Sequence, residues 1–268
     1  MSQPLLAVPA TRSTKTSSDD RSTQETGEHP VLVYGSSVEL DQIDETVKGV
    51  LSSTEILTEL DSGNIVIEPF NRINLSNCSY DVTLGEYYFR HTPNPHDPLL
   101  IYVPWNPDHV RRYWGEPQTA LQVRHDNQGA SGLSQGTKYI LIYPGETILA
   151  HTNEFIGGRT VPNSNRAITT MMKARSSMGR SGISICKDAG WGDIGYINRW
   201  TLEITNFAQV PVALLVGERI GQIVFFYTGH PVTTYSGSYQ TSDDINTLRR
   251  TWTPMELLPK PKRDLHGQ

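Results

Sequence analysis

Cysteine is scarce in this sequence, and long apolar runs are absent. The two cysteines, Cys78 and Cys186, lie far apart among 268 residues, which excludes a disulfide framework and favours a reducing compartment. No stretch is long and apolar enough to cross a bilayer. The first ten residues have neither the basic nor the apolar region of a secretion signal. We therefore predict a cytoplasmic protein with no membrane partner.

Positive charge and metal-binding motifs are also sparse. Lys and Arg number 23 against 28 Asp and Glu, a formal net charge of −5, whereas proteins that coat nucleic acid are basic. The sequence has neither the His-x-Glu and Pro-Cys-x-x-Cys pair of the zinc deaminases nor a His-Glu-x-x-His motif. The glycine-rich run at 129–138 lacks the Gly-Lys-Ser/Thr ending of a P-loop. We predict no nucleic-acid partner, no zinc and no metal-ligand set.

Composition divides the chain into one domain with two tails. Residues 1–45 are rich in Ser, Thr, Asp, Glu and Gln and cannot bury enough apolar area to fold, so they are predicted to be a disordered tail. Residues 46–258 form the predicted domain, and 259–268 a flexible tail. The segment 91–136 is rich in Pro, Gly and Asn, which predicts a loop insertion without a core of its own.

Within the domain, short apolar runs separated by turn signals predict an all-β fold. A capping box at Ser52–Glu55 predicts one short N-terminal helix that ends near Gly63. The predicted strands are residues 65–67, 80–84, 87–89, 139–143, 147–151, 200–205, 210–215 and 220–227.

Two carboxylates, Asp193 and Glu203, stand ten residues apart near a predicted strand. Because side chains alternate along a strand, Glu203 faces away from Trp200 and Leu202. The ordinary interpretations are a solvated strand face for Glu203 and a turn cap for Asp193, which follows Gly192. Either carboxylate can alternatively activate a water molecule.

A polar segment lies upstream of these carboxylates. Arg175 and Arg180 flank two hydroxyls, Ser176 and Ser177. Guanidinium groups bind phosphate oxygens in pairs, although an exposed loop held by side chain to backbone bonds has the same composition. Together with the carboxylates, the segment indicates hydrolytic chemistry on a phosphorylated substrate.

Six segments, in order along the sequence, fit the pattern of one family: 51–56 with 63–70, 79–85, 143–146, 175–180, 188–196 and 217–222. With these segments, the chain resembles the dCTP deaminases, the sister group of the trimeric dUTPases. The segment 175–180 is the most specific of them, and the match runs from about residue 51 to 239, interrupted at 91–136. The resemblance implies a dUTPase-like distorted jelly-roll or β-barrel, a homotrimer with sites shared between subunits, and zinc-independent deamination of dCTP to dUTP and ammonia.

The resemblance also implies catalytic roles for particular residues. Glu203 matches the glutamate that activates water and moves protons to the cytosine ring. Asp193 matches the aspartate that orients the water attacking phosphate in dUTPases and in bifunctional deaminases that form dUMP. Ser176 and Arg180 match polar groups that support the deamination site.

Further positions match residues that bind the nucleotide. Arg175, Ser177 and Gln222 match triphosphate-binding groups, and Mg²⁺ is expected to accompany the triphosphate. Ala189 is expected to contact the base through its backbone, and Tyr196 to lie beneath the deoxyribose. Tyr239 and Gln240 match residues of the C-terminal lid.

The lid and the hairpin depart from the family pattern. Ser238 stands where the lid has a lysine and Ser242 where it has a second glutamine, and Lys173 or the Arg249–Arg250 pair are candidate replacements for the missing cation. Asn198 and Arg199 stand near a usual glycine, and Gly192 replaces an apolar residue. Three functions stay open: a dCTP deaminase with or without dUMP formation, a dUTP diphosphatase that uses Asp193, and a nucleotide-binding homologue without turnover.

Overall fold

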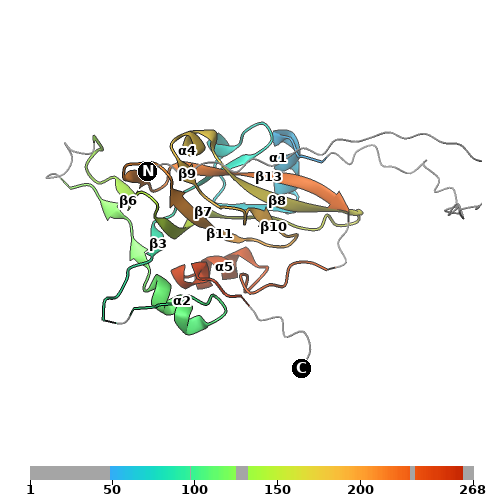
Figure 1. Cartoon of the computed structure of the whole chain (residues 1–268). Coiled ribbons are helices and arrows are strands. Elements are labelled where there is room, and N and C mark those ends of the chain that lie inside the picture. The colour runs from blue at the N-terminus through green and yellow to red at the C-terminus, as the bar shows by residue number, and fades with distance from the viewer. Residues whose placement is uncertain (1–48, 97, 125–131, 230–232, 262–268) are drawn as a thin grey trace, which may run out of the picture. The chain divides into compact units, whose positions relative to one another are not determined.

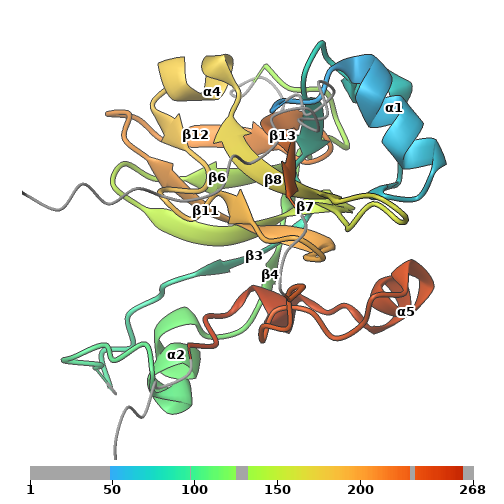
Figure 2. The ribbon, with the colours of Figure 1, turned by 90° about the vertical axis from the view of Figure 1, so that its right-hand side faces the viewer.

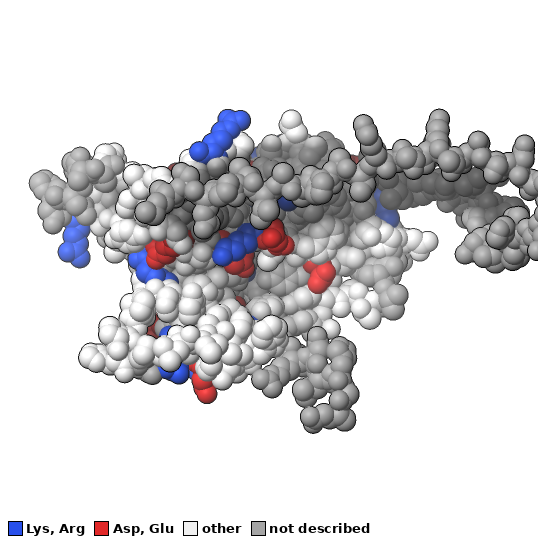
Figure 3. All heavy atoms as spheres, viewed as in Figure 1, with Lys and Arg blue, Asp and Glu red and all other residues white. Residues whose placement is uncertain are grey.

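The computed structural model of the chain describes residues 49–96, 98–124, 132–229 and 233–261. The tail predicted at 1–45 lies outside these residues, as does most of the one predicted at 259–268. Within the described part, no helix is long and apolar enough to span a membrane. On the face shown in Figure 3, most of the described surface is uncharged, and the charged side chains on it are of both signs.

The N-terminal helix forms where the capping box predicts it. Helix α1 (Ser53–Asp61) begins after Ser52, whose hydroxyl accepts a hydrogen bond from the Glu55 backbone N–H while the Glu55 carboxylate accepts one from the Ser52 N–H. Ile56 lies on the inner face of the helix and is fully buried. Glu59 is buried as well, and its carboxylate accepts a hydrogen bond of 2.6 Å from the Tyr227 hydroxyl.

Thirteen strands account for most of the described regular structure, which confirms the mainly β prediction. They are β1 (Ile65–Glu68), β2 (Tyr80–Thr83), β3 (Tyr87–Arg90), β4 (Gln118–Thr119), β5 (Leu121–Gln122), β6 (Lys138–Ile142), β7 (Thr147–Gly158), β8 (Arg166–Ala174), β9 (Ile183–Ser184), β10 (Trp191–Gly192), β11 (Asn198–Asn206), β12 (Val212–Leu215) and β13 (Arg219–Gly229). The jelly-roll closure and the homotrimer stay predictions.

The strands pair antiparallel in three sheets (Figure 1). One has the order β4-β3-β7-β11-β9, with β1 also paired to β7; the second has the order β10-β8-β13-β2, and the third β12-β6-β5. Buried residues of the two larger sheets, such as Tyr80, Ile156 and Phe225, share one hydrophobic core. β11 lies between β7 and β9, and pairing with both strands fixes the positions of the β11 side chains on the face away from this core.

The insertion at 91–136 contains more regular structure than its composition predicts. Helix α2 (Pro107–Trp114) begins at Asn106, whose side chain accepts hydrogen bonds from two N–H groups of the first turn. Trp114 packs with Phe89, with Leu149 and with Leu257 from the C-terminal part of the chain in a second hydrophobic cluster. Figure 2 shows α2 and the C-terminal helix α5 (Ile245–Thr251) on the side of β3 opposite α1. The insertion was predicted as a loop without a core of its own, and helix α2 was not foreseen.

Candidate active site

Glu203 lies on β11 with the orientation that strand alternation predicts. Trp200 and Leu202 are 4% and 0% exposed and point into the core, whereas the half-buried Glu203 points to the other face. There it lines a cavity of about 560 Å³. Its directly opposite neighbour on β7 is Leu149, so one wall of the cavity is the surface of this strand pair.

One oxygen of the Glu203 carboxylate is buried without a hydrogen-bond partner in the part of the chain that the structure describes. Its Oε2 atom is inaccessible to solvent and has no hydrogen-bond partner among the described residues. Burial raises the pKa of Glu203 to about 7, against the smaller opposing effects of its own backbone N–H and the positive charge of Lys187. A carboxyl group with a pKa near neutrality can both accept and return a proton.

Four of the other predicted site residues line the same cavity. Asp193 is exposed in the turn after β10, and Ala189 lies in the loop before that strand. Tyr196 packs edge-on against Tyr235, with ring centroids 5.1 Å apart, and burial raises the pKa of its hydroxyl. Tyr239 reaches the cavity from the C-terminal segment. The structure thus brings both carboxylates and the predicted nucleoside-binding positions together.

The predicted phosphate-binding residues lie elsewhere in the chain. Arg175 precedes the short helix α4 (Ser176–Arg180) and forms an ion pair of 3.3 Å with Asp81. With Ser177, it lines a separate space of about 300 Å³. Gln222, also predicted to bind phosphate, is half-buried on β13, and Ser176 and Arg180, predicted to support the deamination site, are exposed on α4. None of these three lines the Glu203 cavity.

Gln240, which was predicted to bind substrate, forms hydrogen bonds with the protein backbone. Its Oε1 accepts a hydrogen bond of 2.6 Å from the Ile197 N–H, and its Nε2 donates to the Gly195 carbonyl at 2.9 Å. Both amide atoms are therefore engaged with the turn that follows Asp193. The residue fixes the C-terminal segment against this turn.

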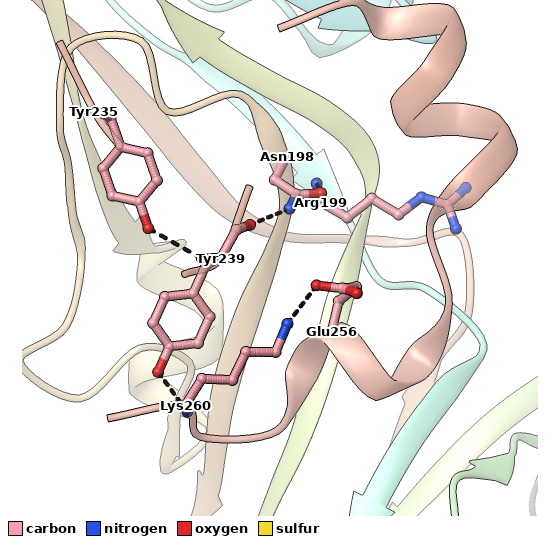
Figure 4. A network of polar contacts seen from close by, with 6 residues as sticks. All are labelled: Asn198, Arg199, Tyr235, Tyr239, Glu256 and Lys260. Carbon is pink, nitrogen blue, oxygen red and sulfur yellow. Dashed lines mark hydrogen bonds and ion pairs between the residues drawn. The ribbon is translucent and has the colours of Figure 1, made fainter. Parts of the chain in front are cut away.

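The residues that depart from the family pattern at 198 and 199 hold the same segment (Figure 4). The Asn198 side chain donates to the Tyr239 carbonyl at 2.6 Å. The Arg199 guanidinium lies over the Trp252 ring, 4.6 Å from its centroid. At the other end of the segment, the Lys260 N–H donates to the Tyr239 hydroxyl at 2.9 Å. These contacts place Tyr239 at the edge of the cavity.

Close packing explains why residue 192 is a glycine, which the sequence alone did not reveal. A Cβ atom at this position would lie 2.5 Å from Cζ2 of Trp200, and closer still to the Thr170 hydroxyl. The Trp200 indole occupies the volume that an apolar side chain at 192 would fill, and its Nε1 donates to the Ile156 carbonyl at 3.0 Å. The small residue Gly192 therefore leaves room for the large side chain of Trp200.

Several cavity residues were missed by sequence reasoning. Among the described residues that line the cavity, Lys187 is the one cation, and it has a positive φ of 42°. Of the proposed substitutes for the lid lysine, Lys173 lines a neighbouring space, and Arg249 pairs with Glu68 at 3.1 Å. Lys187 follows Cys186, to which no role was assigned, and only the fold places it beside Glu203.

No metal centre is built into the described part of the chain. No group of three His, Cys, Asp or Glu side chains there is placed to hold a metal ion. Asp193 and Glu203 are the two carboxylates that line the cavity. A divalent ion at this site would depend on oxygen ligands supplied by a substrate.

Comparisons with known proteins identify the family of the chain. A family model described as dCTP deaminase-like matches residues 50–228. The chain belongs to this family. A curated relative from Acidothermus cellulolyticus, named dCTP deaminase, dUMP-forming, is 31% identical over 192 residues, covering 70% of this chain and 85% of the relative. One of the same name from Methanococcus aeolicus is 31% identical, covering 68% and 85%.

A partial likeness also links the chain to a solved structure. The 2′-deoxycytidine 5′-triphosphate deaminase from Agrobacterium tumefaciens matches with 18% identity and a TM-score of 0.46. The match covers 68% of this chain and 49% of the Agrobacterium chain. The family match extends only to residue 228, so Tyr235 and Tyr239 lie beyond it.

Proposed function

We propose that the protein is a hydrolytic dCTP deaminase in which Glu203 activates the attacking water. The observation that carries this proposal is the buried Oε2 atom without a partner, on a carboxyl group whose pKa is raised to about 7. Family membership supports the substrate class, because the relatives are named for this reaction. The cavity beside Glu203 supplies the space for a nucleoside.

One carboxylate can carry both proton transfers that the reaction needs. Glu203 takes a proton from water as the oxygen bonds to C4 of cytosine, and passes that proton to ring nitrogen N3. It then takes the second proton from the new hydroxyl and gives it to the departing amino group. The C4–N bond breaks, the base becomes uracil, and dUTP and ammonia are the products. A pKa near 7 suits a group that must be ionised at the first step and protonated at the second.

Asp193 is proposed to support a second step, the conversion of dUTP to dUMP and diphosphate. Its side chain is exposed at the cavity, where it can orient a water toward the α-phosphate. The relatives named dUMP-forming support this extension. Mg²⁺ bound to the triphosphate would neutralise charge on the phosphate oxygens.

The phosphate-binding groups are proposed to come from a neighbouring subunit of a homotrimer. Among the described residues of one chain, a single lysine lines the cavity, while Arg175 and Ser177 line another space. A triphosphate carries several negative charges and needs more cations than this cavity provides. A site completed by Arg175, Arg180 and their hydroxyl neighbours across an interface satisfies that need.

Product analysis tests the proposed function. Purified protein is incubated with dCTP and Mg²⁺, and ammonia, dUTP and dUMP are quantified over time, with dUTP tested separately. Stoichiometric ammonia is expected, with dUMP as the final nucleotide. Hydrolysis of dUTP without ammonia from dCTP would identify a dUTP diphosphatase. Tight nucleotide binding with no product would identify a non-catalytic homologue, and either result would overturn the proposal.

The variant Asp193→Asn separates the two steps. It removes the carboxylate that orients water at the phosphate but leaves the exposed turn the same size. We expect ammonia release to continue while dUTP accumulates in place of dUMP. Equal loss of ammonia and dUMP would contradict separate roles for the two carboxylates.

A further inference from the structure

The insertion at 91–136 contributes directly to the Glu203 cavity. Tyr102, Pro104 and Trp114 line it together with the carboxylates. The resemblance to the deaminases is interrupted over this segment and assigns these residues no role. The cavity wall that they form is aromatic and apolar, whereas a phosphate-binding surface is polar or positively charged.

This wall is anchored next to Glu203. Trp114 is 8% exposed and packs in one cluster with Leu149, which is 5% exposed. Leu149 is the residue directly opposite Glu203 in the β7–β11 pair, and side chains at such positions are immediate neighbours on one face of a sheet. Tyr102 packs against the same cluster. Leu149 therefore lies between the insertion and the Glu203 carboxylate.

A stack of three rings fixes the orientation of Tyr102. Its ring stacks on Tyr113 with centroids 4.5 Å apart, and Tyr113 stacks on His91 at 4.0 Å with an interplanar angle of 8°. His91 Nδ1 lies 2.7 Å from the Tyr113 carbonyl oxygen, which ties the last ring to the helix α2 backbone. Tyr102 itself is half-buried and lies at the cavity end of this stack.

We propose that Tyr102 is the platform on which the pyrimidine ring of the substrate stacks while C4 faces Glu203. This inference rests on the proposed function and names a binding residue for it. A planar nucleobase gains most from an aromatic surface that is already fixed in place. The contact is independent of the phosphates, so the cavity can select the base even though the phosphate-binding groups lie elsewhere in the chain.

Kinetics of ammonia release from dCTP test this platform. Tyr102→Leu keeps an apolar side chain but removes the ring, and it is expected to raise KM about 5- to 150-fold, the range for loss of one stacked base, with a much smaller effect on kcat. Tyr102→Phe restores the ring and is expected to restore KM to within a few-fold of the wild-type value. Trp105→Leu is the matched control, because Trp105 is 52% exposed in the same insertion and does not line the cavity.

The outcomes separate this inference from the proposed function. Ammonia release by the wild-type protein tests the function alone. If Tyr102→Leu leaves KM within about twofold of the wild-type value, or if Trp105→Leu raises it equally, the platform is wrong and the deaminase proposal stands.

A second measurement keeps Tyr102 in place and does not depend on how its variants fold. In the Glu203→Gln protein, the Kd of dCTP is compared with that of its 5,6-dihydro analogue, whose ring is neither aromatic nor planar. Binding of the analogue is expected to be at least several-fold weaker. Equal affinities would overturn the platform.

Discussion

At the scale of single residues, Glu203 combines a predictable orientation with an unpredictable environment. Alternation along β11 placed it on the face away from the core, and the burial of Trp200 and Leu202 confirms that face. The absence of a partner for its Oε2 within the described residues could not be predicted, because it depends on segments far away in the sequence that close the cavity. A buried carboxylate without a partner costs stability, a cost that functional sites often carry.

The raised pKa of Glu203 predicts how activity depends on pH. Glu203 must be ionised to accept the first proton from water, and its pKa is about 7. We therefore expect kcat/KM for ammonia release to rise with pH up to about 7 and then to level off. Initial rates between pH 5 and pH 9 measure this dependence. A profile that is flat from pH 5 upward would mean that Glu203 is already ionised and is not the titrating base.

The same pKa predicts how stability depends on pH. Because the folded pKa of about 7 exceeds the ordinary value of 4.5, the folded state retains a proton that the unfolded state has lost. The contribution of Glu203 to stability therefore falls as pH rises from about 4.5 to 7. Glu203→Gln is expected to unfold at a higher temperature than wild type at pH 8 and at nearly the same temperature at pH 4. A constant difference across this range would contradict the assignment.

At the scale of elements, local signals predicted some segments better than others. Helix α1 follows its capping box, and most predicted strands differ from the observed ones by only a few residues. The Asn106–Pro107 pair is a helix start signal, yet α2 was missed because Pro, Gly and Asn dominate its surroundings. Strand β8 was missed because its residues do not alternate cleanly between polar and apolar, as both of its faces are partly buried.

The contact of β10 with β11 gives a prediction about stability. Gly192→Ala is expected to destabilise the protein by about 1–3 kcal/mol, because its Cβ would collide with the Trp200 indole. Urea unfolding measures the change. Gly229→Ala is the control, since no atom lies within 4 Å of a Cβ there. The double variant Gly192→Ala/Trp200→Val is expected to lose less stability than the sum of the two single losses, and strictly additive losses would contradict direct compensation.

At the scale of the whole molecule, the predicted site is divided into two groups. Glu203, Asp193 and Tyr196 share one cavity, while Arg175 and Ser177 line a second space. The resemblance to the deaminases implied sites shared between subunits, but the motifs themselves do not show which residues one chain brings together. A trimer with shared sites reconciles the motifs with the geometry of one chain.

Mixing two inactive variants tests whether sites are shared. Glu203→Gln disables one group, and Arg180→Ala disables the other through a side chain that is exposed in the single chain. If each site combines groups from two subunits, random reassembly of equal amounts should restore about a quarter of the sites. Deaminase activity after mixing and reassembly measures this. Activity no higher than that of the separate variants would contradict shared sites.

The most direct test of the Glu203 assignment is ammonia release from dCTP by Glu203→Gln, measured beside dCTP binding by the same protein. Glu116→Gln is the control, because Glu116 is exposed and lies outside the cavity. We predict that Glu203→Gln lowers the ammonia release rate at least about 100-fold, the scale of a lost general base, while dCTP still binds and Glu116→Gln stays active. Ammonia release by Glu203→Gln at the wild-type rate would show that this carboxylate does not activate the water.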